Sequence, residues 1–249
     1  MKPLLAFFFL LASCFLLVAQ EPIDRRLNSS EQLFQKLVSQ QAAPIWFQVE
    51  KIDTLPRLDA LLSRNDIGAD LKSPALMQAA TVGDAELVNL LIRWGTNVNY
   101  RRARDGQTIL MVAAIHGFSV QCGNDPLVYS YPGNTEIVQA LLNAGAHLDD
   151  QDDSGNTALM LAAENGRSGS VELLLNSGAS ANLRNKERST ALISAVSNGR
   201  GSNIKEIVAA LIANGAELNA RGDQGKTALS YAAGNTAIRE MLIRAGAIE

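Results

Sequence analysis

The sequence has few of the residues and motifs that carry chemistry. Among its 249 residues there are 2 histidines and 2 cysteines, and aromatic residues make up 5%. The phosphate-binding pattern GxxxxGK[ST] and the nucleophile pattern GxSxG do not occur. Catalysis needs several convergent groups with matched pKa values, and these motifs are the usual signs of such a site. We therefore expect a protein that is not an enzyme and has no cofactor.

Neither sign of charge is in large excess. The chain has 22 lysines and arginines and 25 aspartates and glutamates, which gives a formal net charge of -3. Nucleic-acid-binding domains carry a basic face, so we expect no nucleic-acid partner. A hydrophobic fraction of 47% is that of an ordinary globular chain, and the length suffices for one or two cores.

A long apolar run occurs at the N-terminus, where uncharged residues extend from Leu4 to Ala19. As a helix these 16 residues would span about 24 Å, less than a hydrocarbon core of about 30 Å. Residues 1–19 are therefore interpreted as a signal peptide, cleaved after Ala19. Two alternatives stay open: Leu11 to Cys14 is similar to a bacterial lipobox, which would place lipid on Cys14, and the run could remain as an anchor. Each interpretation exports the chain, to the periplasm or outside the cell.

Removal of the signal peptide would leave Cys122 as the single cysteine. An intramolecular disulfide is then excluded, and Cys122 is either a free thiol or a link to another molecule. One cysteine with His116 and His147 is too few for a zinc site of the usual kind. The fold must therefore be stable through packing.

The chain does contain an internal repeat. The stretch from Asp153 to Arg184, DSGNTALMLAAENGRSGSVELLLNSGASANLR, recurs with changes four more times. The threonine of the unit, or its equivalent, stands at Pro74, Thr108, Thr157, Thr190 and Thr227, so the gaps are 34, 49, 33 and 37 residues. A basic period of 33 with insertions in two copies is typical of stacked repeats.

Each unit predicts two helices. In the unit at Thr157, the threonine hydroxyl can cap the first helix, and Gly166 can end it in the left-handed conformation. A second apolar stripe follows at helical spacing, at Val171, Leu174 and Leu175. One such pair cannot bury its own stripe, so we expect it to stack on its neighbours.

The segments GNTALMLAAENG, GQTILMVAAIHG and RSTALISAVSNG, with second-helix segments such as EIVQALLNAGAHLD, resemble the ankyrin repeat over about residues 71–249. The resemblance implies an all-α solenoid of helix–turn–helix units joined by hairpin-like fingers, and a function in binding proteins. The family's histidine is replaced at five places: Met77, Met111, Met160, Ile193 and Ser230. We therefore expect its hydrogen bonds to be absent, and apolar packing to replace them in the four copies that have methionine or isoleucine.

The repeats divide the chain. After the signal peptide we expect a polar segment and helix at 20–44, where Ser29 or Ser30 would cap and Leu33, Phe34 and Leu37 would share a face. The ankyrin-repeat domain covers 45–249, with a degenerate N-terminal unit at about 45–70 that would act as a cap. The clear repeats lie at about 71–101, 103–149, 152–183, 185–220 and 222–249.

An insertion at 118–133 distinguishes the second clear repeat. Phe118, Tyr129 and Tyr131 make it too apolar for an idle loop. The insertion therefore either covers a neighbouring helix or contacts a partner, and the sequence leaves both open.

The expected fingers alternate in charge. We expect neighbouring fingers of opposite sign to attract each other, or the pattern to select one partner. The residues concerned are Arg101, Arg102 and Arg104 in the first finger, Asp149, Asp150, Asp152 and Asp153 in the second, and Arg184, Lys186 and Arg188 in the third.

The resemblance implies binding through finger tips and the concave side of the first helices. We expect a monomeric scaffold that binds a protein partner of unknown identity. An inhibitor or immunity-type protein against a secreted toxin or enzyme is the alternative, and a redox or structural role through Cys122 is a third. The implied positions are Arg104, Asp105, Gln107, Ile115, His116, Asp153, Ser154, Asn156, Glu164, Asn165, Lys186, Glu187, Ser189, Ser197, Asn198, Asp223, Gln224 and Lys226.

Overall fold

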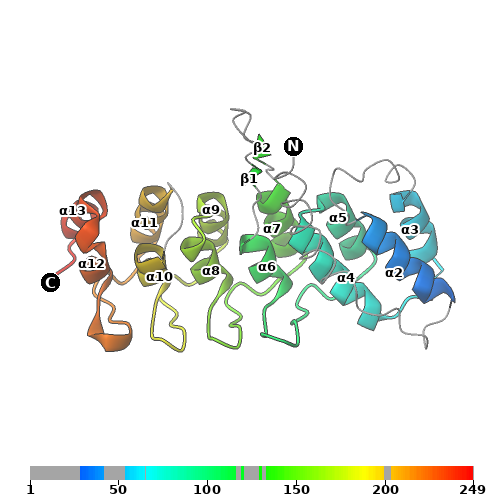
Figure 1. The fold of residues 1–249 in the computed structure, drawn as a ribbon, viewed down its shortest axis with the longest axis horizontal. Helices are drawn as coiled ribbons and strands as arrows, with labels where there is room; N and C mark the ends of the chain where they lie inside the picture. Colours follow the sequence, from blue (N-terminus) through cyan, green and yellow to red (C-terminus); the bar gives the residue numbers. More distant parts are fainter. Residues whose placement is uncertain are drawn as a thin grey trace, which may run out of the picture. The chain divides into compact units, whose positions relative to one another are not determined.

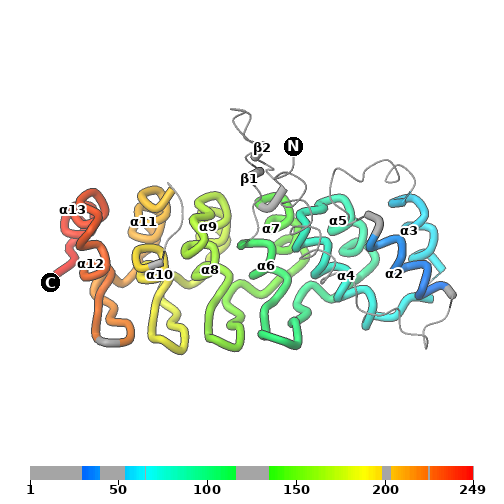
Figure 2. Tube along the Cα trace, viewed as in Figure 1, coloured from blue at the N-terminus to red at the C-terminus, as the bar shows by residue number. Residues whose placement is uncertain are grey.

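The computed structural model describes residues 29–41, 54–64, 66–115, 119–120, 129–130, 133–198 and 203–248, traced in Figure 2. The chain divides into two compact units, Met1–Ala75 and Leu76–Glu249. Within the described ranges, no helix has the length and apolarity needed to cross a membrane. Several predictions lie outside these ranges: the signal peptide, Cys14, His116, Phe118, Cys122 and Tyr131.

The first unit contains helix α2, Ser29–Gln41. Phe34 and Leu37 are buried as predicted, together with Val38, whereas Leu33 is 38% exposed. The buried stripe therefore runs through positions i, i+3 and i+4 from Phe34. The prediction was wrong for Leu33, and wrong also for Ser29 and Ser30 as caps, because the helix already begins at Ser29.

Helix α3, Thr54–Leu62, packs on α2. Leu58, Leu61 and Leu62 are buried. Pro56 lies in the first turn of α3, where the missing N–H would have no intrahelical partner. The degenerate N-terminal unit thus contains the helix that its apolar spacing predicts.

Helix α4, Ala69–Val82, contains Pro74 and spans the division between the two units. Pro74 stands where the other units have threonine, yet the helix begins five residues earlier, at Ala69. Proline in a helix interior removes one backbone hydrogen bond and usually bends the helix. The first clear repeat therefore has a longer first helix than the threonine spacing predicts.

In the second unit the helices lie in two layers (Figure 1). The first-helix layer contains α6, Ile109–Ile115; α8, Ala158–Glu164; α10, Ala191–Asn198; and α12, Ala228–Tyr231. The second-helix layer contains α5, Ala85–Arg93; α7, Gly133–Asn143; α9, Ser168–Asn176; α11, Ile204–Ala213; and α13, Thr236–Arg244. Short 3-10 turns, η2 at Asp223–Gly225 and η3 at Ala232–Gly234, belong to the last repeat.

Threonine and glycine set the ends of the first helices as the sequence predicts. The Oγ1 of Thr157 accepts from the backbone N–H of Met160 at 3.3 Å, which satisfies one of the orphan donors of the first turn. Gly166 follows the helix at φ 69°, a left-handed conformation that glycine adopts without strain. Thr108, Thr190 and Thr227 accept from the corresponding N–H groups of their own helices.

The residues that replace the family's histidine are mostly core residues. Met111 and Met160 are only 1% and 2% exposed, and Met77 and Ile193 are also buried. The prediction of apolar packing in four copies is therefore confirmed. Met111 adds a bond that was not predicted, because its sulfur accepts from Thr108 N–H at 3.4 Å. In the last copy Ser230 completes a capping box with Thr227.

Neighbouring repeats within the second compact unit are joined by a side-chain bond that we call the inter-unit clamp. In each repeat the acceptor is the residue four positions after the glycine that ends the second helix. It accepts the backbone N–H of the residue that stands two positions after the corresponding glycine of the next repeat. Asn182 Oδ1 accepts from Glu217 N–H at 2.7 Å, and its Nδ2 donates to the Gly215 carbonyl at 3.0 Å. The equivalent acceptors are Asn99 for His147, Asp149 for Ser180 and Asn219 for Ile248.

The insertion of the second repeat contains a short antiparallel ribbon. Strand β1, Ser119–Val120, pairs with β2, Tyr129–Ser130. The ribbon adds two short strands to the all-α fold. Helix α7 begins at Gly133, so the insertion ends one residue earlier than predicted.

Apolar burial and the inter-unit clamp should contribute unequally to stability. Leu174 is fully buried, so Leu174→Ala should lower the free energy of unfolding by about 2–5 kcal/mol. Asn182→Ala removes two exposed hydrogen bonds and should cost about 1–2 kcal/mol, and Asn182→Asp, which keeps the acceptor, should cost less. Urea unfolding with hydrogen exchange checks this. Unchanged protection of residues 157–215 in Leu174→Ala would contradict the nearest-neighbour model.

Candidate protein-binding surface

Four hairpins, which we call the fingers, precede the threonines of the first helices, at residues 102–107, 152–156, 185–189 and 222–226. Each is closed by a backbone bond across its base, as from Asp152 N–H to the Asn156 carbonyl at 2.9 Å. A side-chain oxygen closes the second and third fingers from inside: Asp152 Oδ1 accepts from Asn156 N–H, and Asn185 Oδ1 accepts from Ser189 N–H, both at 2.8 Å. The fingers are therefore ordered hairpins with fixed tips.

Backbone bonds join each finger to the next. The N–H of Asp153 donates to the Asp105 carbonyl at 3.0 Å, that of Lys186 to Ser154 at 3.0 Å, and that of Asp223 to Glu187 at 2.9 Å. These are six of the residues at which the resemblance implies partner contacts. The structure brings them together as a continuous row across four units.

The finger tips use glycine for two reasons. Gly106 and Gly155 have φ of 69° and 81°, where a side chain is strained. A Cβ on Gly155 would also meet Lys186 N at 2.9 Å, so the next finger passes too close for a side chain. Gly225 occupies the same position at φ 70°.

Arg188 stands at this glycine position in the third finger, with φ 58°. It is the one residue other than glycine with positive φ in the described chain, and this conformation costs about 1–2 kcal/mol with a Cβ present. Its side chain is exposed. The predicted site residues omit Arg188, because they include the positions on either side of the glycine and skip the glycine itself.

The exposed charges at one finger position alternate in sign. Arg104, Asp153, Lys186 and Asp223 occupy the same place in four successive fingers, and all four are exposed. Adjacent fingers therefore present opposite charges about one helix spacing apart, roughly 10 Å. The sequence predicts this alternation for the first three fingers, and Asp223 extends it to the fourth.

The expected attraction between fingers was wrong for the first finger. Arg102 donates from Nε and Nη2 to the Asp105 carboxylate at 2.9 and 2.7 Å, and Arg104 Nε lies 3.2 Å from the same group. Both arginines thus pair inside their own hairpin, because Asp105 is three and one residues away. Asp152 likewise accepts from its own finger, from Ser154 and Asn156.

Most cations in the fingers and in the residues just before them have a partner within the chain. Arg101 donates to the Gln151 carbonyl, Arg184 to Glu217 and the Arg221 carbonyl, and Arg221 to the Gly225 carbonyl. Lys226 Nζ lies 5.5 Å from the centre of the Tyr231 ring, a cation–π distance. Lys186 and Arg188, in contrast, have no side-chain partner in the described part of the chain.

The predicted residues at the ends of the first helices form a separate set. Ile115, Glu164 and Ser197 are partly exposed. Asn165 caps α8, and its Nδ2 donates to the Leu161 carbonyl at 2.8 Å, so its amide is already engaged. The side chains of Asn198 and Gln224, like all of His116, lie outside the described part, and for Tyr129 only the backbone of β2 is described.

Arg167 bonds to the C-terminal end of α6. Its Nε donates to the carbonyl of Ile115 in the preceding repeat at 2.8 Å, which satisfies a carbonyl at a helix C-terminus. Burial lowers the pKa of the Arg167 guanidinium. The C-terminal end of α6 is thereby bonded to the next repeat, a contact that periodicity alone does not predict.

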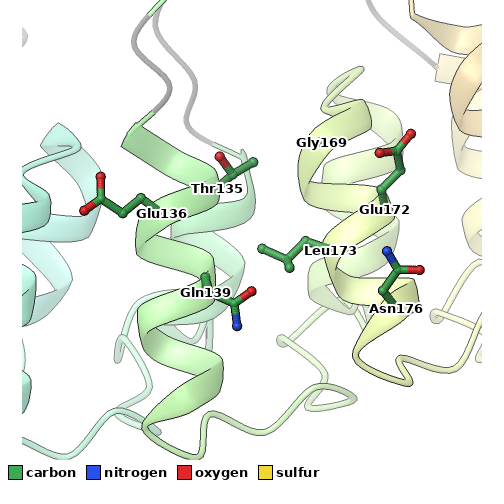
Figure 3. Close-up of a pocket in the computed structure, with 7 residues that line it drawn as sticks. All are labelled: Thr135, Glu136, Gln139, Gly169, Glu172, Leu173 and Asn176. Atoms are coloured by element: carbon green, nitrogen blue, oxygen red, sulfur yellow. The ribbon is translucent and has the colours of Figure 1, made fainter.

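An open groove of 470 Å³ lies between α7 and α9 (Figure 3). Leu173 points from α9 into the space between the helices, whereas the carboxylates of Glu136 and Glu172 point away from each other on opposite sides. The lining therefore lacks the convergent polar groups of a catalytic site. In the described residues there is also no cluster of three metal-binding side chains.

Stacked helix pairs of this length, joined by hairpin fingers, define a helical repeat protein. An ankyrin-repeat model matches residues 73–103, and a model of three ankyrin repeats matches 119–185 and 170–248. The chain belongs to the ankyrin repeat family. Ankyrin repeats are generally protein–protein interaction modules and are typically non-catalytic. No curated protein matches the chain significantly.

The conformation of Arg188 makes a direct prediction about stability. Arg188→Ala keeps the strain and removes the charge, so the free energy of unfolding should stay near that of the wild type. Arg188→Gly removes the strain but adds freedom to the unfolded chain, and should be more stable than Arg188→Ala by about 0.5–1 kcal/mol. Urea unfolding measures the difference, and equal values would show that the tip is unstrained.

The charge cluster of the first finger predicts a pH dependence. The hydrogen bonds from Arg102 lower the pKa of Asp105 below its ordinary value of 3.8. A lowered pKa stabilises the fold above 3.8, and this contribution is lost as the pH falls through the lower folded-state value. Asp105→Asn should therefore reduce stability at pH 6 and leave it little changed near pH 2. Denaturant midpoints at both values test this; an equal loss at both would contradict an ionic origin.

Proposed function

We propose that the row of fingers binds one protein partner, with the ends of the first helices beside it and the 118–133 insertion as a second contact. The observation that carries this proposal is the alternation of exposed charge at Arg104, Asp153, Lys186 and Asp223. Backbone bonds between the fingers hold these positions in register, so the charges form a fixed pattern.

A pattern of this kind favours selectivity over strong non-specific attraction. The four charges sum to zero, so a partner is not drawn by net charge. Its own charges must match the sequence of signs, because like charges brought together are costly while matched ones raise the association rate. Spacings of about 10 Å are comparable to the Debye length at physiological salt, so each finger acts as a nearly independent contact.

The proposed compartment is an exported one, periplasmic or secreted. The apolar run from Leu4 to Ala19 supports this, since its length suits a signal peptide better than a membrane span. The partner would then belong to the same compartment. Lipid on Cys14 would place the same binding domain at a membrane surface.

A charge swap tests the finger row without changing net charge. The variant Asp153→Lys with Lys186→Asp reverses two adjacent signs, and Lys205→Glu with Glu206→Lys is the matched swap on exposed residues of α11. Affinity capture from the native compartment, quantified by mass spectrometry, should recover one dominant partner. We expect the finger swap to lower its recovery at least tenfold with an unchanged melting temperature, and the α11 swap to have no effect.

The same capture assigns a role to the insertion and bears on the alternative function. Replacement of Phe118 to Pro132 by a two-residue turn should reduce recovery if the insertion contacts the partner, and should instead lower the melting temperature if it covers the stack. A captured enzyme or toxin that loses activity in the complex would identify an inhibitor. Equal recovery by the finger-swap variant and the wild type would refute the finger row as the binding surface.

A further inference from the structure

We propose that Arg188, assisted by Lys186, is the anchor of this surface and binds an acidic side chain of the partner. The proposal rests on the finger row as the binding surface and names the chemistry of its central contact. Arg188 and Lys186 belong to the same finger and carry the cations that lack an internal partner in the described part of the row.

The other cations in the fingers and just before them are already engaged. Arg102 and Arg104 share Asp105, Arg184 pairs with Glu217 at 3.2 Å, and Lys226 lies over Tyr231. A carboxylate arriving from a partner would have to compete with each of these contacts. At Lys186 and Arg188 it displaces only water, so the third finger is where an anion gains most.

The backbone at Arg188 supports the same conclusion independently. The first, second and fourth fingers have glycine at this position, whereas the third finger has Arg188 at φ 58°. Strained conformations persist where the surrounding structure fixes them, and they concentrate at functional sites. The side chain makes no hydrogen bond or ion pair in the described chain that would offset the strain, so a polar contact outside the chain is the compensation that we infer.

The finger is built to hold this conformation. Arg188 N–H donates to the Asn185 carbonyl at 2.9 Å, and Asn185 N–H donates to the Ser189 carbonyl at 3.0 Å. Asn185 Nδ2 reaches the preceding finger, where it donates to Asn156 Oδ1 at 2.9 Å. The guanidinium therefore extends from a rigid base, and its planar fork can bind a carboxylate through two parallel hydrogen bonds.

The neighbours of Arg188 restrict which acidic segment fits. Asp153 and Asp223 are exposed on the fingers on either side, and Glu187 lies between the two cations. A continuous run of acidic residues would meet like charge on both sides. The partner segment that fits has one acidic residue flanked, about 10 Å away in each direction, by basic residues. In an extended chain this is a spacing of three residues.

The test uses the full chain and the synthetic peptide KGSEGSK, which has this spacing; EGSKGSE is its charge-reversed control. Titration into the 15N-labelled protein at low salt should shift the amide signals of residues 185–189 and saturate. Arg188→Ala and Arg188→Gly should each raise the dissociation constant at least tenfold. Lys186→Gln should raise it by a smaller factor. Arg244→Gln, which alters an exposed arginine on α13, is the control and should bind as the wild type does.

Three results would overturn the proposal: equal binding by wild type and both Arg188 variants, preference for EGSKGSE, or absence of saturable binding at millimolar peptide. Because the Ala and Gly variants differ in strain but share the loss of charge, equal weakening in both separates the lost contact from a folding effect. Capture of the native partner separates the two levels of inference. If the finger swap abolishes capture and Arg188→Ala does not, the finger row stands and the anchor is wrong.

Discussion

The inter-unit clamp between neighbouring repeats is the interaction on which the geometry of the compact unit Leu76–Glu249 depends. Each unit's apolar stripe can be buried only by its neighbours, and burial of residues such as Leu174 supplies most of the stability. Apolar contacts are not directional, however, and would permit small sliding motions. The bonds from Asn99, Asp149, Asn182 and Asn219 to the backbone of the following unit fix its position. Register at the finger tips follows from this and from the backbone bonds between fingers.

The repeated elements could be predicted from the sequence because each rests on a local rule. Threonine caps at Thr108, Thr157 and Thr190, and a left-handed glycine after α8, follow from requirements of single helix ends. Methionine is buried at the position of the family's histidine because that position lies on the core-facing side of the helix. The helix at Leu33 shows the limit of such reasoning: Leu33, Phe34 and Leu37 fit a helical stripe, and so do Phe34, Leu37 and Val38. Periodicity over so few residues does not choose between them.

The candidate site could be predicted only in outline. The charge signs of the fingers are visible in the sequence, but pairing is decided by hairpin geometry, and Asp105 lies inside the same hairpin as Arg102 and Arg104. The bond from Arg167 to the Ile115 carbonyl joins residues 52 apart, and no local pattern marks it. Arg188 did leave a signal, since an arginine replaces a glycine that three other fingers keep. Alignment of the fingers on that glycine would have singled it out.

Oxidation of the buried methionines can report how often individual repeats of the stack open. Met111 and Met160 lie in the first turns of successive first helices and are almost completely shielded, so a peroxide reaches their sulfurs only when the repeat that contains them opens. The rate of sulfoxide formation at each sulfur then reports how often that unit opens. A polar sulfoxide no longer suits the apolar core, so each oxidation event makes the next opening easier. Oxidative damage would therefore spread from the unit that opens most often to its neighbours.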